Sequence, residues 1–221
     1  MNLAQMISAF RSEADDATEE YLWSEEEVIE FANDAEREAC RRARLLRDSS
    51  TTAICQIAVT IGNPLLTLDD RVLFVRRAKL TSRTRVLFPR FLADMDEQVP
   101  GWEDQEGTVD SFLPDYETGK IRLFRKPEAT DTVNLTVIRL PLADMADPEE
   151  DSPEISPAYH RSLVYWMLYR AYSKHDSETR NDKAAMENLA MFEQEFGKRS
   201  PAYDEQWIRE QYIVDGYTGT T

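Results

Sequence analysis

The sequence has few of the residues from which catalytic and metal sites are built. Its 221 residues include two cysteines, two histidines and seven glycines. The two histidines, His160 and His175, have no further histidine or cysteine close by in the sequence, so a zinc site is not expected. No dinucleotide-binding, P-loop, nucleophile-elbow or zinc-protease motif is present, and the glycines form no phosphate-binding cluster. The sequence therefore predicts a protein that is not an enzyme and that uses no cofactor.

The remaining candidates for chemistry are ordinary structural residues. Cys40 and Cys55 are predicted to be small buried apolar residues, with a disulfide as the alternative. His160 lies near a predicted helix start, and His175 lies at a helix end, where the helix dipole favours a cation. The run 94–97 could bind a hard cation, but it lacks the ligand spacing and the glycine turn of an EF-hand. We therefore predict no metal site.

Long apolar runs and an N-terminal basic region are also missing. No run approaches the roughly 20 apolar residues of a membrane helix. The first charged residue is Arg11, so a secretory signal is not expected. The sequence predicts a soluble protein that does not bind membranes.

Acidic residues dominate the charge. Asp and Glu total 42 against 26 Lys and Arg, giving a net charge of −16. Nonspecific binding to nucleic acid depends on Lys and Arg, so this balance argues against a protein that wraps DNA. An acidic surface repels a polyanion and would suit a channel through which DNA slides. Charge alone leaves this role and simple solubility both open.

Helical patterns occupy the two ends of the chain. A short helix is predicted over about 2–16, and a longer one over about 24–47, where Ser24 and Glu27 form a capping box. Ser156-Pro157 begins the next helix, and the last helix runs from about 180 to 196 and ends at Gly197.

The middle of the chain is rich in β-branched residues and turn signals. Strands are expected over 51–60, 68–80, 84–88, 121–124 and 133–140, forming a small antiparallel sandwich or barrel. The fold class predicted is α+β: an antiparallel bundle of about four helices with an inserted small antiparallel β domain and an extended C-terminal tail. The predicted domains are bundle helices at 1–48, a β insert at 49–145, bundle helices at 146–197 and a docking tail at 198–221.

Charge is segregated within the β insert. A basic stretch is followed by an acidic one, which suggests either two solvated loops or two complementary faces that meet between neighbouring subunits. The predicted inter-subunit basic edge comprises Arg71, Arg76, Arg77, Lys79, Arg83 and Arg85. The predicted inter-subunit acidic loop comprises Asp94, Asp96, Glu97, Glu103, Asp104 and Glu106.

The tail has no helical period but is rich in aromatic residues, which often act as anchors in binding segments. We predict that it docks on another subunit or protein, with packing on its own domain as the alternative. The predicted docking residues are Tyr203, Trp207, Ile208, Tyr212, Ile213 and Tyr217.

An ordered series of motifs resembles the head-to-tail adaptor proteins of tailed phages, also called connector or tail accessory proteins. The series includes 23–27 (WSEEE) with 33–38 (NDAERE), 101–103 (GWE) with 106–108 (EGT), 119–127 (GKIRLFRKP), 139–141 (RLP), 153–155 (PEI), 159–178 and 192–197 (FEQEFG). Arg125 stands where the strand motif of the family usually has proline. The resemblance covers about residues 20–197, and no single motif in it is decisive.

The resemblance implies a structural virion protein at the head–tail junction, made in the host cytoplasm. It implies a ring of probably twelve copies below the portal, which joins capsid to tail and lets DNA pass without specific binding. The partners implied are the portal protein, the tail, nozzle or other neck proteins, and further copies of the chain itself. The tail would dock on the portal.

Two other classes of protein stay open. The nearest alternative is another neck or tail-completion protein of the virion, because the folds of these classes overlap. A small module that binds a peptide or nucleic acid has only the basic stretch 71–90 in its favour.

Overall fold

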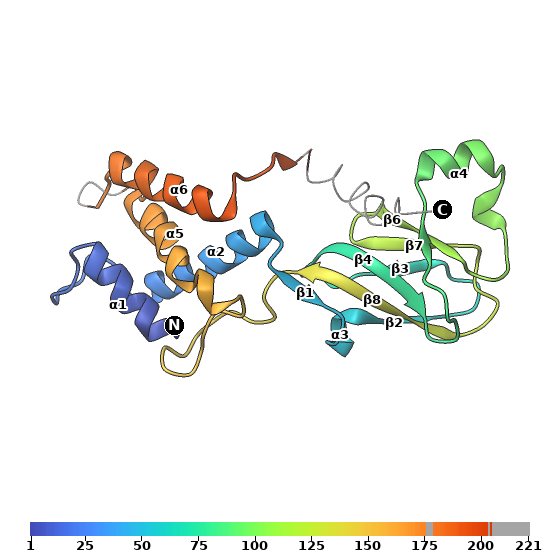
Figure 1. Cartoon of the computed structure of the whole chain (residues 1–221), viewed down its shortest axis with the longest axis horizontal. Helices are drawn as coiled ribbons and strands as arrows, with labels where there is room; N and C mark the ends of the chain where they lie inside the picture. The colour runs from blue at the N-terminus through green and yellow to red at the C-terminus, as the bar shows by residue number, and fades with distance from the viewer. Residues whose placement is uncertain (176–178, 203, 205–221) are drawn as a thin grey trace. The chain divides into compact units, whose positions relative to one another are not determined.

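The computed structural model of the protein describes residues 1–175, 179–202 and 204. Its fold is α+β, as the sequence predicts, and contacts within the chain divide it into two compact units. The helical unit is formed by Met1–Leu46 with Leu140–Arg199, and the β unit by Arg47–Arg139. Figure 1 shows the chain leaving the helices, forming the β unit and returning to the helices.

Four longer helices pack around the core of the helical unit (Figure 1). They are α1 (Leu3–Glu13), α2 (Glu25–Ala43), α5 (His160–Tyr172) and α6 (Asp182–Phe196), and a short helix η2 (Pro157–Tyr159) precedes α5. Ala32, Ala35 and Ala39 of α2 are fully buried. Their side chains are small, so a neighbouring helix can approach α2 closely. The antiparallel order of the four helices stays a prediction.

Polar side chains fix where the helices begin and how the loops join them. Ser24 and Glu27 form the capping box of α2 that the sequence predicts. Asn33 of α2 is buried, and its side-chain amide donates to the Met145 carbonyl at 2.9 Å and accepts from the Met145 N–H at 2.8 Å. This pair of bonds fastens the returning loop to α2. Gly197 ends α6 at a φ of 82°, a conformation that favours glycine.

Two sheets build the β unit around a shared core. The first contains β1 (Leu46–Asp48), β2 (Gln56–Val59), β4 (Val72–Leu80) and β8 (Asp131–Arg139), and the second contains β3 (Leu65–Thr67), β5 (Phe88–Pro89), β6 (Ser111–Glu117) and β7 (Lys120–Phe124). Val75 and Leu135 of the first sheet and Phe112 and Leu123 of the second belong to one buried cluster. The remaining helices of this unit are α3 (Thr52–Cys55), α4 (Leu92–Gln98) and η1 (Trp102–Asp104).

The prediction of a wholly antiparallel β domain is wrong in one place. β5 pairs with β6 in parallel, with Phe88 opposite Ser111 and Pro89 opposite Phe112. A parallel pair needs a long connection, and residues 90–110 supply it by folding into α4 and η1. The sequence contains the strand residues, but it does not show that this acidic segment turns back over the sheet.

The predicted strand over 51–60 is also partly wrong, because its first half is the helical turn α3. The Asp48 carboxylate accepts hydrogen bonds from the backbone N–H groups of Ser50 and Thr51 and from the Thr51 hydroxyl. These local bonds compete with a strand and bend the chain. Cys55 ends the turn. Cys55 and Cys40 of α2 are both buried, and they form no disulfide with each other.

Asp48 also holds the two ends of the β unit together. Its Oδ2 lies 2.7 Å from Nε of Arg139, which is 91 residues further along the chain, and both side chains are almost completely buried. Burial alone would raise the pKa of Asp48, but the bonds from Thr51, Ser50 and Arg139 lower that pKa well below its usual range. The folded β unit therefore favours the charged form of Asp48.

We expect the substitution Asp48→Asn to reduce the free energy of unfolding by about 3 kcal/mol or more, because it removes the negative charge from a buried ion pair. The stabilisation by Asp48 is present above the unfolded pKa of about 3.9 and is lost as the pH falls towards the lower folded pKa. Urea unfolding followed by circular dichroism measures both effects. Asp70→Asn, at an exposed position nearby, is the control, and equal unfolding midpoints for the two variants would contradict the expectation.

Glu36 is the corresponding buried acid in the helical unit, with 2% of its surface exposed. Its Oε1 accepts the backbone N–H groups of Glu154 and Ile155, at 2.5 and 3.2 Å. The Ile155 carbonyl accepts from Nε2 of the buried His160 at 2.9 Å, so His160 has the structural role that the sequence predicts. Burial raises the pKa of Glu36 to about 7 in spite of the two N–H donors.

Because the pKa of Glu36 is raised, its favourable contribution is complete below the unfolded pKa and is lost as the pH rises through about 7. The stability of the helical unit should therefore fall between about pH 4.5 and 7 by up to about 1.4 kcal/mol per pH unit. Glu36→Gln keeps an acceptor for the two N–H groups and removes the charge, so it should abolish this slope and stabilise the protein at pH 8. Thermal unfolding across this pH range tests the expectation, with the exposed Glu30→Gln as control, and an unchanged slope in Glu36→Gln would refute it.

Candidate assembly surfaces

The six basic residues of the predicted edge do not form one continuous row. Arg71 precedes β4 and makes a bidentate ion pair with Asp69, with both bonds at 2.8 Å. The hydrogen bond from Arg71 lowers the pKa of Asp69 to about 2. Arg76, Arg77 and Lys79 belong to β4, whereas Arg83 and Arg85 follow it. The residues therefore fall into three groups, of which the first is neutralised within the chain.

Two cations point outward from the first sheet. Arg77 and Lys79 are two residues apart on β4, and the fully buried Ala78 between them points inward. They lie opposite Thr136 and Asn134 of β8, which carry no charge. Among the residues that the structure describes, neither cation makes a salt bridge. Together with the exposed Arg85, this pair leaves part of the basic stretch available to an acidic partner.

The predicted acidic loop is folded around Trp102. α4 carries Asp94, Asp96 and Glu97, η1 carries Glu103 and Asp104, and Glu106 follows. The Trp102 indole N–H donates to Oδ1 of Asp96 at 2.9 Å, and its ring packs edge-on against Tyr116. Trp102 and Met95 join Leu113 and Phe124 in a separate small core. Because of this core, the segment has a defined surface.

Several acids of this segment are occupied by partners within the β unit. Glu103 accepts the Tyr116 hydroxyl at 2.8 Å, which raises the pKa of that phenol. Asp104 lies 2.9 Å from the Lys126 ammonium, whose hydrogen bond lowers the pKa of Asp104. The described residues provide no such partner for Asp94 or Glu97 of α4, nor for the exposed Glu106. The charge available to another molecule thus comes from two residues of α4 and from Glu106.

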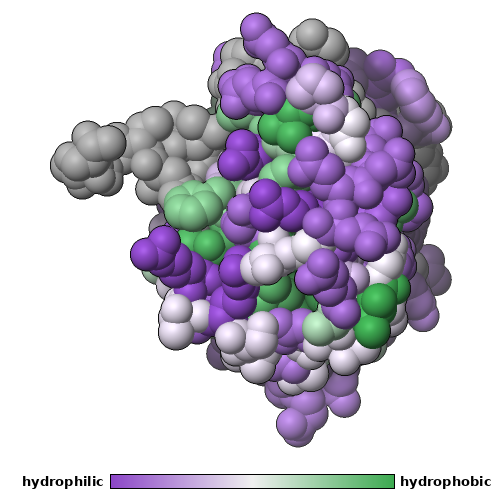
Figure 2. Space-filling view, turned by 90° about the vertical axis from the view of Figure 1, so that its right-hand side faces the viewer, coloured by the Kyte–Doolittle hydropathy of each residue, from purple (hydrophilic) through white to green (hydrophobic). Residues whose placement is uncertain are grey.

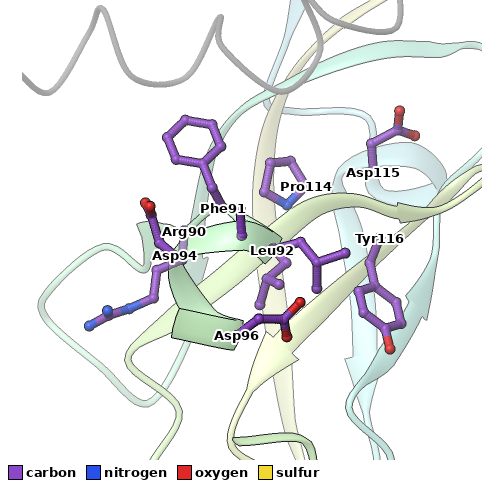
Figure 3. Close-up of a pocket in the computed structure, with 10 residues that line it drawn as sticks. Arg90, Phe91, Leu92, Asp94, Asp96, Pro114, Asp115 and Tyr116 are labelled. Carbon is purple, nitrogen blue, oxygen red and sulfur yellow. The ribbon is translucent and has the colours of Figure 1, made fainter. Parts of the chain in front are cut away.

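A hollow of about 550 Å³ separates α4 from β6. Figure 3 shows Leu92 and Pro114 at its centre, with Asp96, Asp115 and Tyr116 around them. Its lining includes no histidine, cysteine, serine or threonine, and no group of His, Cys, Asp and Glu in the described part of the chain could hold a metal ion. The hollow can offer apolar contact with charged edges, which suits a protein partner.

Exposed apolar residues lie beside these charges. Phe88 and Leu92 are 51% and 48% exposed, on either side of the junction between β5 and α4. The face of the β unit in Figure 2 is mostly hydrophilic, with small separate apolar areas. The charge pattern of the sequence does not single out Phe88 or Leu92. The signal that could have done so is the place of Phe88 in a short edge strand and of Leu92 at the start of the helix that follows.

The predicted docking residues Tyr203, Trp207, Ile208, Tyr212, Ile213 and Tyr217 lie outside the described residues. Within residues 1–175, 179–202 and 204, no helix is long and apolar enough to cross a membrane.

Comparison with known proteins gives the class of the chain. The family model described as SU10 adaptor protein matches residues 1–212, which is nearly the whole length. No curated protein matches. The match identifies a structural adaptor protein of a phage and confirms the resemblance of its motifs to head-to-tail adaptors. The chain belongs to the SU10 adaptor protein family.

Proposed function

We propose that the protein is one subunit of a head-to-tail adaptor ring that lies below the portal, joins the capsid to the tail and lets the genome pass. The observation that carries this proposal is the adaptor family match over residues 1–212. Family membership supports contacts with other virion components and a location in the virion. The ring, its position and a copy number of twelve are the proposal.

The two units suggest a division of labour. The helical unit would supply contacts between subunits close to the portal, and the β unit would face tail or neck components. The tail 198–221 would anchor the ring on the portal protein, and assembly would then be sequential, since the anchor site exists only after the portal ring. The net charge of −16 supports a channel wall that repels DNA.

The basic stretch 71–90 and the acidic stretch 94–106 would meet between neighbouring copies. A ring-closing contact joins two different surfaces of the same protein, so it needs two such complementary regions on each copy. Arg71 is paired within the chain, whereas Arg77, Lys79 and Arg85 make no salt bridge with any described residue. These three residues, and Asp94 and Glu97 on the acidic side, are the members of the two sets best suited to such contacts.

We expect the full chain to co-migrate with the portal protein of the same phage in size-exclusion chromatography, and a chain ending at residue 197 to lose this association. The truncated chain keeps α6 and its last core residue, Phe196, so its helical unit should stay folded. Trp207→Ala in the full chain is a milder variant, which should weaken the association. Equal binding by the truncated chain would show that the tail is not the anchor.

We also expect the protein not to retain double-stranded DNA at an ionic strength of about 0.15 M, because the net negative charge repels the polyanion. An electrophoretic mobility assay over a series of salt concentrations measures this. Arg77 is exposed, Lys79 is half-buried, and both could bind phosphate, so a variant with both changed to alanine is the matched control. Tight DNA binding that this variant loses would support the nucleic-acid-binding module instead of the adaptor.

A further inference from the structure

A basic hollow follows β4. Its volume is about 580 Å³, and the residues that line it are Ser82, Arg83, Thr84, Arg85, Val86, Phe88, Arg90 and Asp110. Contacts within the β unit position two of its arginines, because Arg83 donates to the Val109 carbonyl and Nε of Arg90 donates to the Ser111 hydroxyl at 3.0 Å.

The charge of this hollow is only partly compensated. Its one acid, Asp110, accepts the Ser111 hydroxyl and lies 3.8 Å from the Arg125 guanidinium. The Arg85 side chain is exposed, and no described residue pairs with it. The hollow therefore combines the exposed ring of Phe88 with a positive charge that lacks a partner.

The outer face of α4 has the complementary properties. Met95 is the only residue of α4 that is buried, so the rest of this helix surface is open. Asp94 and Glu97 are three residues apart and therefore share one face of the helix. The last turn contains no basic residue, although a cation is favoured at the C-terminal end of a helix. A cation from another molecule would meet this face with little competition.

The two surfaces are distinct but adjoin. Arg90 lines both the hollow after β4 and the hollow beside α4, whereas Arg85 lines only the first and Asp94 only the second. In Figure 1 the turn after β4 is at the lower edge of the β unit, and α4 is at its upper edge. Two different complementary surfaces on one chain are what a heterologous contact requires, and such contacts can close into rings.

We propose that the hollow after β4 of one copy receives α4 of the next copy, an inference that rests on the proposed ring function. Phe88 would pack against Leu92 of the neighbour at the centre of the contact, and Arg85 would pair with Asp94 and Glu97 at its rim. Apolar centres stabilise interfaces, whereas charged rims mainly fix register and partner choice. A second copy fits better than a nucleic acid, because the acids of α4 repel phosphate.

Cysteine cross-linking tests the contact in the full chain. A variant with Arg85→Cys and Glu97→Cys is mixed with the portal protein and oxidised, and the unmodified chain is the control, because Cys40 and Cys55 are buried. A disulfide between copies gives a ladder of dimers and higher multimers on a non-reducing gel, whereas one within a copy does not. The proposal predicts the ladder.

The outcomes separate this contact from the function on which it rests. Co-migration with the portal protein without a ladder would overturn the contact and leave the adaptor function standing. A ladder at high protein concentration without portal binding would support the contact and count against the function. The absence of both would overturn both.

Charge reversal provides a second, independent measurement. Arg85→Glu alone or Glu97→Arg alone should reduce the amount of adaptor bound per portal at least tenfold. The two substitutions together in one chain should restore it, because each contact between copies then pairs an acid at position 85 with a base at position 97. Arg47→Glu makes the same charge change at an exposed position of β1 that belongs to neither surface, and this variant should bind as the unmodified chain does. A double variant no better than the single ones would overturn the pairing.

Discussion

The buried ion pair between Asp48 and Arg139 is the interaction on which the architecture depends. These residues stand at the second and last positions of the β unit, 91 residues apart in the chain, and their side chains meet at 2.7 Å. Asp48 also bends the chain into α3 through Ser50 and Thr51. One carboxylate thus fixes where the β unit begins, where it ends and how its first turn runs. A β unit closed at its own ends can be carried between two helical segments without disturbing either of them.

The elements specified by local chemistry could be predicted from the sequence. Ser24 and Glu27 identify the start of α2, because a capping box involves only neighbouring residues. The parallel pairing of β5 with β6 could not be predicted, since it depends on how Trp102 and Met95 fold the acidic segment back over the sheet. Arg139 stands in an apolar strand pattern, and its buried ion pair with the distant Asp48 is not visible in the sequence. The family resemblance rested on the order of short motifs, and Asn33 shows why one of them matters: its amide bonds twice to Met145.

The candidate contact residues could be predicted only as charge blocks. Segregation of basic and acidic stretches is visible in the sequence, but which charges are already neutralised is a property of the fold. Arg71 is paired with Asp69, and Asp104 with Lys126, so these members of the two blocks are less available to a partner. Phe88 and Leu92 carry no charge and are identified only by their exposure. The fold therefore decides which charged and apolar side chains of the two stretches stay available to another molecule.

The central claim is that copies of this chain form a ring directly below the portal. A cryo-electron microscopy map of the head–tail junction of the intact virion tests it most directly, at a resolution that resolves helices. The proposed function predicts a ring of density at that level into which the helical unit and the β unit can each be fitted, with an open channel along the axis. Density for this chain in the tail tube or on the capsid surface, with a different protein below the portal, would contradict it.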